Sequence, residues 1–264
     1  MTIALYCLGM LVLGAGVGLI SAALGLGGGI LMVPAFLTFV PGMDAHTAKG
    51  TSLFIIIFVA ALNAWRLNRG QQERNWDVAG AMAVGSIVGG YAGAWVTSRL
   101  PDQAVIWIYV VFLVGAALRT FLIKPVIIRK EQVRRRSGFA VLIGMAGGAV
   151  GGGTGTGGGL IMVPLSLIAG IISNERVVAL SNMVMVATGI AGTVAHFTAP
   201  RTLDLPGTIG HVSLALTPLV FIGAQLAAPL GHRLETQLTL PRRKAVMGVL
   251  LLAISVRLAY QVLR

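Results

Sequence analysis

A series of apolar runs without formal charge, separated by short polar loops, makes up almost the whole chain. About 20 apolar residues are enough to cross a bilayer as a helix. The pattern therefore predicts an all-α polytopic membrane protein. The runs cover residues 3–24, 30–40, 51–64, 78–96, 105–118, 139–150, 160–172, 177–197, 205–230 and 245–256.

Three of these runs, 30–40, 139–150 and 160–172, are too short to cross the roughly 30 Å hydrocarbon layer as helices. The runs 30–40 and 160–172 each follow a glycine cluster directly. Short apolar segments interrupted by glycine are typical of re-entrant or discontinuous membrane helices. An alternative in which each glycine unit makes two full crossings remains open.

An internal repeat relates the two halves of the chain. At an offset of 130 residues the cluster Gly25–Gly29 falls on Gly155–Gly159, and Met32-Val33-Pro34 falls on Met162-Val163-Pro164. Gly14 and Gly18 fall on Gly144 and Gly148. Weaker matches need other offsets: Arg99 falls on Arg233 at 134, and Arg119 on Arg257 at 138. Such a repeat predicts two copies of one structural unit.

Basic residues indicate that the two copies are inverted. A basic linker, 124–138, divides a first transmembrane repeat, 1–123, from a second, 139–264. If each glycine unit enters and leaves on one side, each copy has a re-entrant unit plus three transmembrane helices. The linker, the loop 66–74 and the cluster 242–244 then share the cytoplasmic side, as basic loops prefer. Four plain crossings per copy would place 242–244 outside.

Composition agrees with this class. Hydrophobic residues make up 56 % of the chain, charged residues only 11 %, and the mean hydropathy is +0.88. Because soluble domains carry roughly 25 % charged residues, we expect the lipid bilayer to be the main solvent. The net charge of +12 lies in loops between apolar runs, so we expect no nucleic-acid partner. The predicted location is a cell inner or plasma membrane.

The two glycine clusters are the leading candidates for a binding site. Consecutive glycines leave backbone amides uncovered, and the start of the following helix carries a partial positive charge. Such a helix start binds anions without a basic side chain. For the remaining glycines, close helix packing is the better interpretation. The candidate substrate-binding glycines, expected to meet near the middle of the membrane, are Gly27, Gly28, Gly29, Gly157, Gly158 and Gly159.

Neutral polar side chains at matching places in the two copies extend the candidate site. Thr51 and Ser52 open one apolar run, and Ser181 and Asn182 stand at the corresponding place in the second half. All eight carboxylates lie at run ends or in loops, so His196 is the candidate for a proton-linked group. We find no motif for a metal, a cofactor or catalysis, and we expect a protein that is not an enzyme.

Several of these residues carry a resemblance to a known family. The motif Gly-Leu-Gly-Gly-Gly-x-x-x-Val-Pro, residues 25–34, the motif Ala48-x-Gly50-Thr51-Ser52 and their second-half echoes resemble the sulfite exporter TauE/SafE family. These are small bacterial permeases, and the resemblance covers nearly the whole chain. It implies transport of small sulfur-containing anions such as sulfite, thiosulfate or organosulfonates. The second copy departs from the pattern at Ser181-Asn182, which implies unequal contributions of the two halves.

The resulting hypothesis is a secondary transporter of a small anion. An anion channel is one alternative, and a membrane-embedded enzyme acting on a lipid is another. Substrate identity, direction, coupling ion and oligomeric state stay open at this stage.

Overall fold

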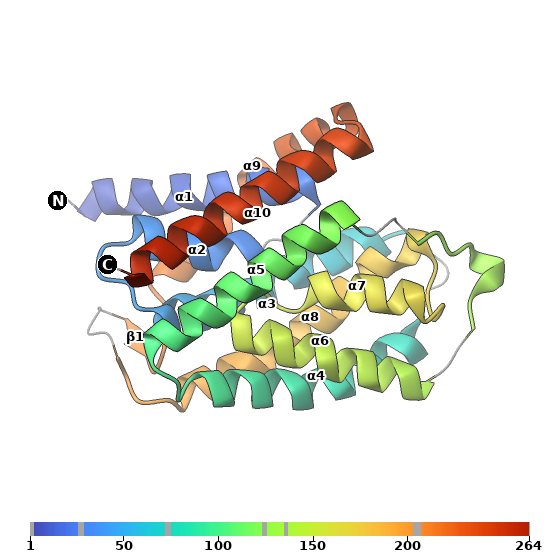
Figure 1. Cartoon of the computed structure of the whole chain (residues 1–264), viewed down its shortest axis with the longest axis horizontal. Helices are drawn as coiled ribbons and strands as arrows, with labels where there is room; N and C mark the ends of the chain where they lie inside the picture. The colour runs from blue at the N-terminus through green and yellow to red at the C-terminus, as the bar shows by residue number, and fades with distance from the viewer. Residues whose placement is uncertain are drawn as a thin grey trace. The chain divides into compact units, whose positions relative to one another are not determined.

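The computed structural model describes residues 3–25, 29–71, 75–122, 126–134, 137–202 and 207–263. Their structure is helical apart from one small β-hairpin, which confirms the predicted all-α class (Figure 1). The first half contains α1 (Ile3–Leu24), α2 (Gly29–Phe39), α3 (Ala45–Asn68), α4 (Trp76–Thr97) and α5 (Asp102–Leu122). The second half contains α6 (Ser137–Thr154), α7 (Gly159–Ile168), α8 (Asn174–Phe197), β1 (Thr208–Ile209), β2 (Val212–Ser213), α9 (Leu216–Gln237) and α10 (Leu240–Leu263), after the 3₁₀ turn η1 (Lys130–Gln132).

The described helices fall into two length classes. Seven of them are long and apolar enough to cross a membrane, which makes the chain a multi-pass membrane protein: α1, α3, α4, α5, α6, α8 and α10. The helices α2 and α7, with 11 and 10 residues, are too short for the hydrocarbon layer. These two short helices follow the glycine clusters, as the sequence predicts.

Two expected segments have different limits in the structure. The run 139–150 is part of an 18-residue helix, α6, because Gly151, Gly152 and Gly153 continue the helix instead of ending it. The run 205–230 is divided, because Gly207 and Gly210 adopt positive φ angles of 73° and 53° and support the β1–β2 hairpin before α9 begins. Hydropathy alone does not mark either limit, since glycine is compatible with both helix and turn.

The chain forms two compact units that are not the two sequence halves. Unit 1 comprises residues 1–51, 100–124 and 200–264, and unit 2 comprises residues 52–99 and 125–199. Each unit therefore draws helices from both halves. The two repeats are defined by similarity along the sequence, whereas the two compact units are defined by contacts between residues. The units therefore do not test the repeat boundary at 124–138, which stays a prediction.

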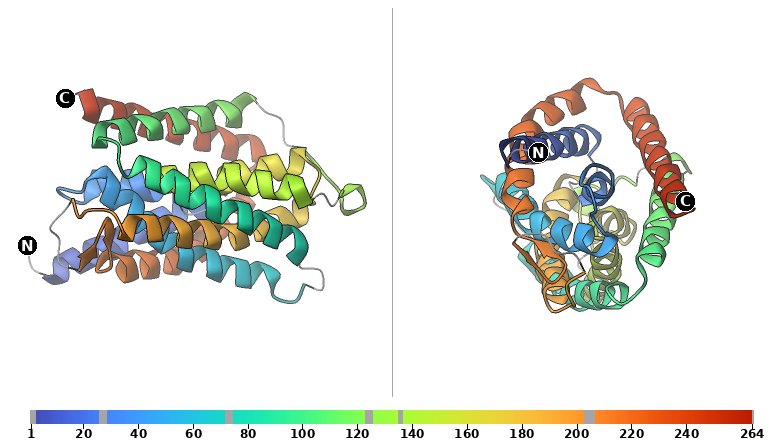
Figure 2. Two further views of the ribbon diagram at one scale, coloured as in Figure 1. Left: turned by 90° about the horizontal axis from the view of Figure 1, so that it is seen from below. Right: turned by 90° about the vertical axis from the view of Figure 1, so that its left-hand side faces the viewer.

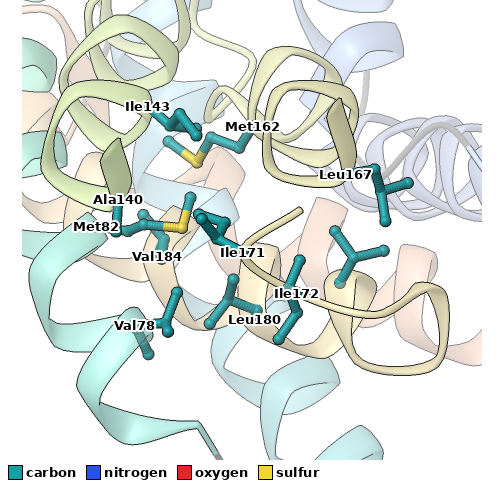
Figure 3. Close-up of a cluster of buried hydrophobic side chains, with 12 residues drawn as sticks. Val78, Met82, Ala140, Ile143, Met162, Leu167, Ile171, Ile172, Leu180 and Val184 are labelled. Carbon is teal, nitrogen blue, oxygen red and sulfur yellow. The ribbon is translucent and has the colours of Figure 1, made fainter. Parts of the chain in front are cut away.

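Unit 2 has an aliphatic and methionine-rich core. Met82 on α4, Met162 on α7 and Val184 on α8 are completely buried there, together with Ile171 in the α7–α8 connection (Figure 3). A buried aliphatic side chain contributes about 1.5–3 kcal/mol relative to an exposed one when water is the reference. These contacts fix α7 against α6 and α8 and so hold the start of α7 in place.

In unit 1, α1 packs along α9 and α5 packs along α10 (Figures 1 and 2). Gly248, near the start of α10, lies against the ring of Phe121 at the end of α5. The helices α5 and α10 therefore run antiparallel, as Figure 1 also shows. In the predicted repeat α5 and α10 occupy equivalent positions, so their antiparallel arrangement is compatible with the prediction of inverted copies, which stays a prediction.

The same glycine contacts occur in both units. A Cβ on Gly14 would lie 2.3 Å from the Val220 carbonyl oxygen, and one on Gly144 would lie 2.0 Å from that of Met82. Gly223 meets the carbonyl of Leu11, just as Gly85 meets that of Val141. Equivalent helices thus pack through equivalent small residues: α1 with α9 in unit 1, and α6 with α4 in unit 2.

These contacts correct one detail of the sequence alignment. They pair α4 with α9 at an offset of 138, the offset that also relates Arg119 to Arg257. The match of Arg99 with Arg233 at 134 is therefore wrong. The additional residues between α8 and α9, which include the β1–β2 hairpin, account for the larger offset.

Candidate functional site

The second glycine cluster forms a tight turn between α6 and α7. Gly155, Gly157 and Gly158 have φ angles of 78°, 78° and 84°, which residues with a Cβ adopt only under strain. The Thr156 and Gly157 amides both donate to the Gly151 carbonyl, at 3.0 and 3.3 Å, and cap α6. The turn then reverses into α7, whose first turn closes on the Gly158 carbonyl.

Ser52 holds this turn from α3. Its hydroxyl donates to the Gly155 carbonyl at 2.7 Å, and both groups are buried. Because a buried carbonyl without a partner is costly, this bond fixes the turn conformation. Of the neutral polar residues predicted for the site, Ser52 is thus joined directly to a glycine cluster.

Neighbouring atoms approach the glycines of the second cluster closely. A Cβ on Gly158 would lie 2.1 Å from the Gly147 carbonyl oxygen, and one on Gly159 would lie 2.8 Å from the Met185 sulfur. Gly157 faces the ends of the Met185 and Ile56 side chains, at 2.9 and 3.1 Å from its Cβ position. The cluster therefore has a packing role here, and access to the α7 amides depends on flexible side chains such as Met185.

The first cluster is described only at its edges. Gly27 and Gly28 lie outside the described residues. Gly25 has a positive φ angle of 69°, and its counterpart Gly155 has one of 78°. Gly29 is buried and is the first residue of α2. The Tyr109 hydroxyl donates to the Ile30 carbonyl at 2.5 Å, which ties the first turn of α2 to α5 within unit 1.

The other predicted residues make local contacts. The Thr51 hydroxyl accepts a hydrogen bond from the Ser213 amide at 3.0 Å, within unit 1. The Ser181 and Asn182 side chains both donate to the Val178 carbonyl of their own helix, at 3.1 and 2.9 Å. His196 is completely buried on α8. These residues remain predictions as contacts of a substrate or a proton.

Replacing Ser52 tests whether its bond to the glycine turn matters more than a hydrogen bond within one helix. We expect Ser52→Ala to lower stability by about 1–3 kcal/mol, because it leaves the buried Gly155 carbonyl without its donor, and to reduce transport. The matched change Ser181→Ala removes only a bond within one helix turn and should cost less than about 0.5 kcal/mol. Thermal unfolding of the two purified variants would test the difference in stability. Equal losses of stability would contradict a special role for Ser52.

A group of ionisable side chains at the beginning of α3 was not predicted from the sequence. Asp44, His46 and Lys49 precede Thr51 along the chain, and the fold of unit 1 adds Asp102 and His211. The carboxylates appear in sequence as ordinary ends of apolar runs. Only the packing of unit 1 brings residues so distant in sequence together, although a lysine two residues before the Thr51-Ser52 pair was a visible signal.

A helical multi-pass fold in which two short helices each follow a glycine cluster is typical of the membrane transporter class. The family comparison agrees. Residues 10–258 match the sulfite exporter TauE/SafE family, and the chain belongs to that family. It is accordingly a membrane transporter protein, as its relatives are described.

Three relatives are each described as a probable membrane transporter protein. One from Haemophilus influenzae is 26 % identical over 207 residues, covering 76 % of each chain. One from Methanocaldococcus jannaschii is 25 % identical over 90 % of this chain and 89 % of its own length. YunE of Bacillus subtilis is 25 % identical over 96 % of this chain and 97 % of its own length. No solved structure matches significantly.

Proposed function

We propose that this protein is a secondary transporter of a small sulfur-containing anion, such as sulfite, thiosulfate or an organosulfonate. The observation that carries the proposal is the way α7 begins. A turn of positive-φ glycines ends at Gly158, and α7 starts at Gly159 without a hydrogen-bonding side-chain cap on its first amides. A helix start of this kind attracts anions through its amide groups and its partial positive charge.

The repeat supplies a second short helix, α2, which starts at Gly29. Each start is equivalent to about half a positive charge. Two starts therefore suit a monoanion or dianion without a buried arginine at the ligand. In this proposal the candidate glycines provide backbone amides, and Thr51, Ser52, Ser181 and Asn182 provide neutral hydrogen-bonding groups.

We further propose that the two copies are inverted. The antiparallel pair α5 and α10 supports this, because parallel copies would make these equivalent helices parallel. Inversion places the equivalent short helices on opposite sides of a pseudo-twofold axis in the membrane plane. Such an arrangement suits alternating access, the mechanism of a carrier.

The sulfur chemistry rests on the family description alone, because the backbone geometry distinguishes anions by charge and size and not by element. Two other functions would show different behaviour. An anion channel would pass its substrate at rates far above those of a carrier. A membrane enzyme would alter a lipid substrate instead of moving a solute.

Uptake by the purified protein in liposomes tests the proposal. We expect saturable uptake of labelled sulfite or thiosulfate, enhanced by a pH gradient and competed by the unlabelled anion but not by chloride. Protein-free liposomes and the Gly158→Val variant provide the controls. Absence of uptake for sulfite, thiosulfate and sulfoacetate, in either gradient direction, would contradict the proposed function.

A further inference from the structure

Five ionisable side chains of unit 1, here called the α3 ionisable cluster, meet at the beginning of α3: Asp44, His46, Lys49, Asp102 and His211. His46, Lys49 and His211 are 6 %, 0 % and 1 % exposed. The Asp102 side chain remains 41 % exposed. Buried ionisable groups in a membrane protein are costly and commonly mark ion or proton pathways.

One hydrogen bond and one ion-pair contact fix the tautomer of His46. Its Nε2 lies 3.0 Å from the Leu100 carbonyl oxygen and 3.2 Å from Asp102 Oδ1. Because both partners are acceptors, Nε2 carries the hydrogen and Nδ1 keeps its lone pair. Nδ1 is buried and has no hydrogen-bond partner among the described residues. A buried lone pair of this kind is a place where a proton can bind.

His211 gives the site a second imidazole. The His46 and His211 rings stack with their centroids 4.9 Å apart and an angle of 23° between their planes. Two imidazolium charges at that separation would repel each other strongly in a buried site. The pair therefore holds at most one added proton.

The carboxylates of the cluster accept hydrogen bonds from neighbouring groups. Asp44 accepts from the Thr47 amide at 2.6 Å, from the Thr47 hydroxyl at 3.1 Å and from the Thr202 hydroxyl at 2.9 Å. Asp102 accepts from the Ala45 amide at 3.2 Å. These bonds occupy carboxylate oxygens, whereas the His46 Nδ1 lone pair has no partner among the described residues and can receive a proton. Lys49 interacts electrostatically with both carboxylates.

We propose that the α3 ionisable cluster is a proton-binding site that couples proton movement to anion transport, with one proton shared by His46 and His211. The inference rests on the proposed function and names its coupling ion. It also moves the proton-linked role from His196, the residue predicted from the sequence, to the beginning of α3.

The proton path follows from the bonds of His46. A proton added at Nδ1 forms an N–H bond and makes an imidazolium. The Nε2–H bond then breaks toward Asp102 Oδ1, which is buried in this conformation, and the proton passes to water when a conformational change exposes that oxygen. His46 is left neutral with its hydrogen on Nδ1, so one proton has moved and no electrons have been exchanged. Uptake is the reverse sequence.

The surroundings of His211 describe the proton-free state. Burial and the charges of His46 and Lys49 lower the pKa of His211 to about 4, against the opposing effects of Asp44 and the Pro200 backbone. Neutral His211 therefore stabilises this conformation above pH 6.5, and that contribution is lost as the pH falls from 6.5 toward 4. Acid favours a conformation in which water reaches the pair, as a proton-coupled cycle requires.

The position of the cluster connects it with the candidate anion site. Ser52, which holds the glycine turn before α7, follows Lys49 by three residues on the continuous helix α3. A change of charge at His46 or Lys49 therefore acts on the same helix that fixes the turn. This provides a physical route for coupling.

Transport measurements test the coupling. In liposomes with an imposed pH gradient, we expect His46→Gln/His211→Gln to lower the gradient-driven accumulation of labelled thiosulfate at least tenfold and to flatten its pH profile. The control is His232→Gln, because His232 is an exposed residue of α9 that pairs with Glu235, and this variant should match the wild type. Wild-type accumulation by the double variant, or loss of coupling in His196→Gln alone, would overturn the proposal.

A second measurement needs no transported substrate. The chain has four histidines, so nitrogen-15 NMR of histidine-labelled protein in nanodiscs can follow each ring. We expect His211 to titrate well below pH 6.5 and its pKa to rise in His46→Gln. A His211 that titrates near 6.5 regardless of His46 would overturn the shared proton. A wild type that carries no anion but shows this NMR behaviour would refute the proposed function and keep the proton site.

Discussion

Gly158→Val should abolish transport. Gly158 has a φ angle of 84°, and its Cβ position is 2.1 Å from the Gly147 carbonyl oxygen. The left-handed backbone costs a residue with a side chain about 1–2 kcal/mol. The backbone contact adds about 1–3 kcal/mol of overpacking, because a carbonyl in a helix has no rotamer with which to move away. We expect uptake to fall at least a hundredfold and the unfolding temperature to fall as well.

Gly170→Val is the matched control for this change. Gly170 also has a positive φ, 64°, but nothing lies within 4 Å of its Cβ position. It therefore reports the cost of backbone strain without the clash. Uptake by Gly170→Val should stay within about threefold of the wild type. Equal losses in both variants would show that strain alone, and not the space beside α6, limits function.

Gly85→Leu should prevent correct packing of unit 2. The α4 and α6 helices approach so closely at Gly85 that a Cβ would lie 2.0 Å from the Val141 carbonyl oxygen. Gly89 and Gly93 meet α6 carbonyls in the same way, at 2.0 and 2.1 Å. A leucine forces the two backbones apart along this contact. We expect loss of most of the monodisperse protein in detergent, with residual material less stable by about 3 kcal/mol or more.

The same helix contains the control. Gly80 lies five residues earlier on α4, is exposed, and has nothing within 4 Å of its Cβ position. Gly80→Leu should therefore give a normal yield and a normal size-exclusion profile. If Gly85→Leu behaved as Gly80→Leu does, the close approach of α4 and α6 would be wrong.

The two short helices could be predicted because their signals are local. A glycine motif precedes each of them, and α2 and α7 are short enough to recognise by length. The packing of α1 with α9 and of α4 with α6 had no such signal. This packing depends on glycines that allow two helices to approach closely. Gly14, which lies against Val220 of α9, is an example, and its role is visible only once the second helix is in place.

The candidate site could be predicted only in part. Ser52 was named because it opens an apolar run, and its bond to the Gly155 carbonyl gives that choice a structural reason. Ser181 and Asn182 look equivalent in sequence, yet they bond within their own helix. The α3 ionisable cluster could not be predicted from the sequence, because Asp102 and His211, which contact His46, lie in distant segments of the chain.

Cysteine accessibility in intact cells tests the central claim, two inverted copies in one membrane protein, most directly. Cys7 is the single cysteine, so Cys7→Ser gives a cysteine-free background. The exposed positions Arg69 and Thr198 follow the equivalent helices α3 and α8. Inverted copies predict that an impermeant maleimide labels Thr198→Cys from outside, whereas Arg69→Cys, Lys130→Cys and Arg242→Cys react only after permeabilisation. Labelling of Arg69→Cys and Thr198→Cys from the same side would contradict the account.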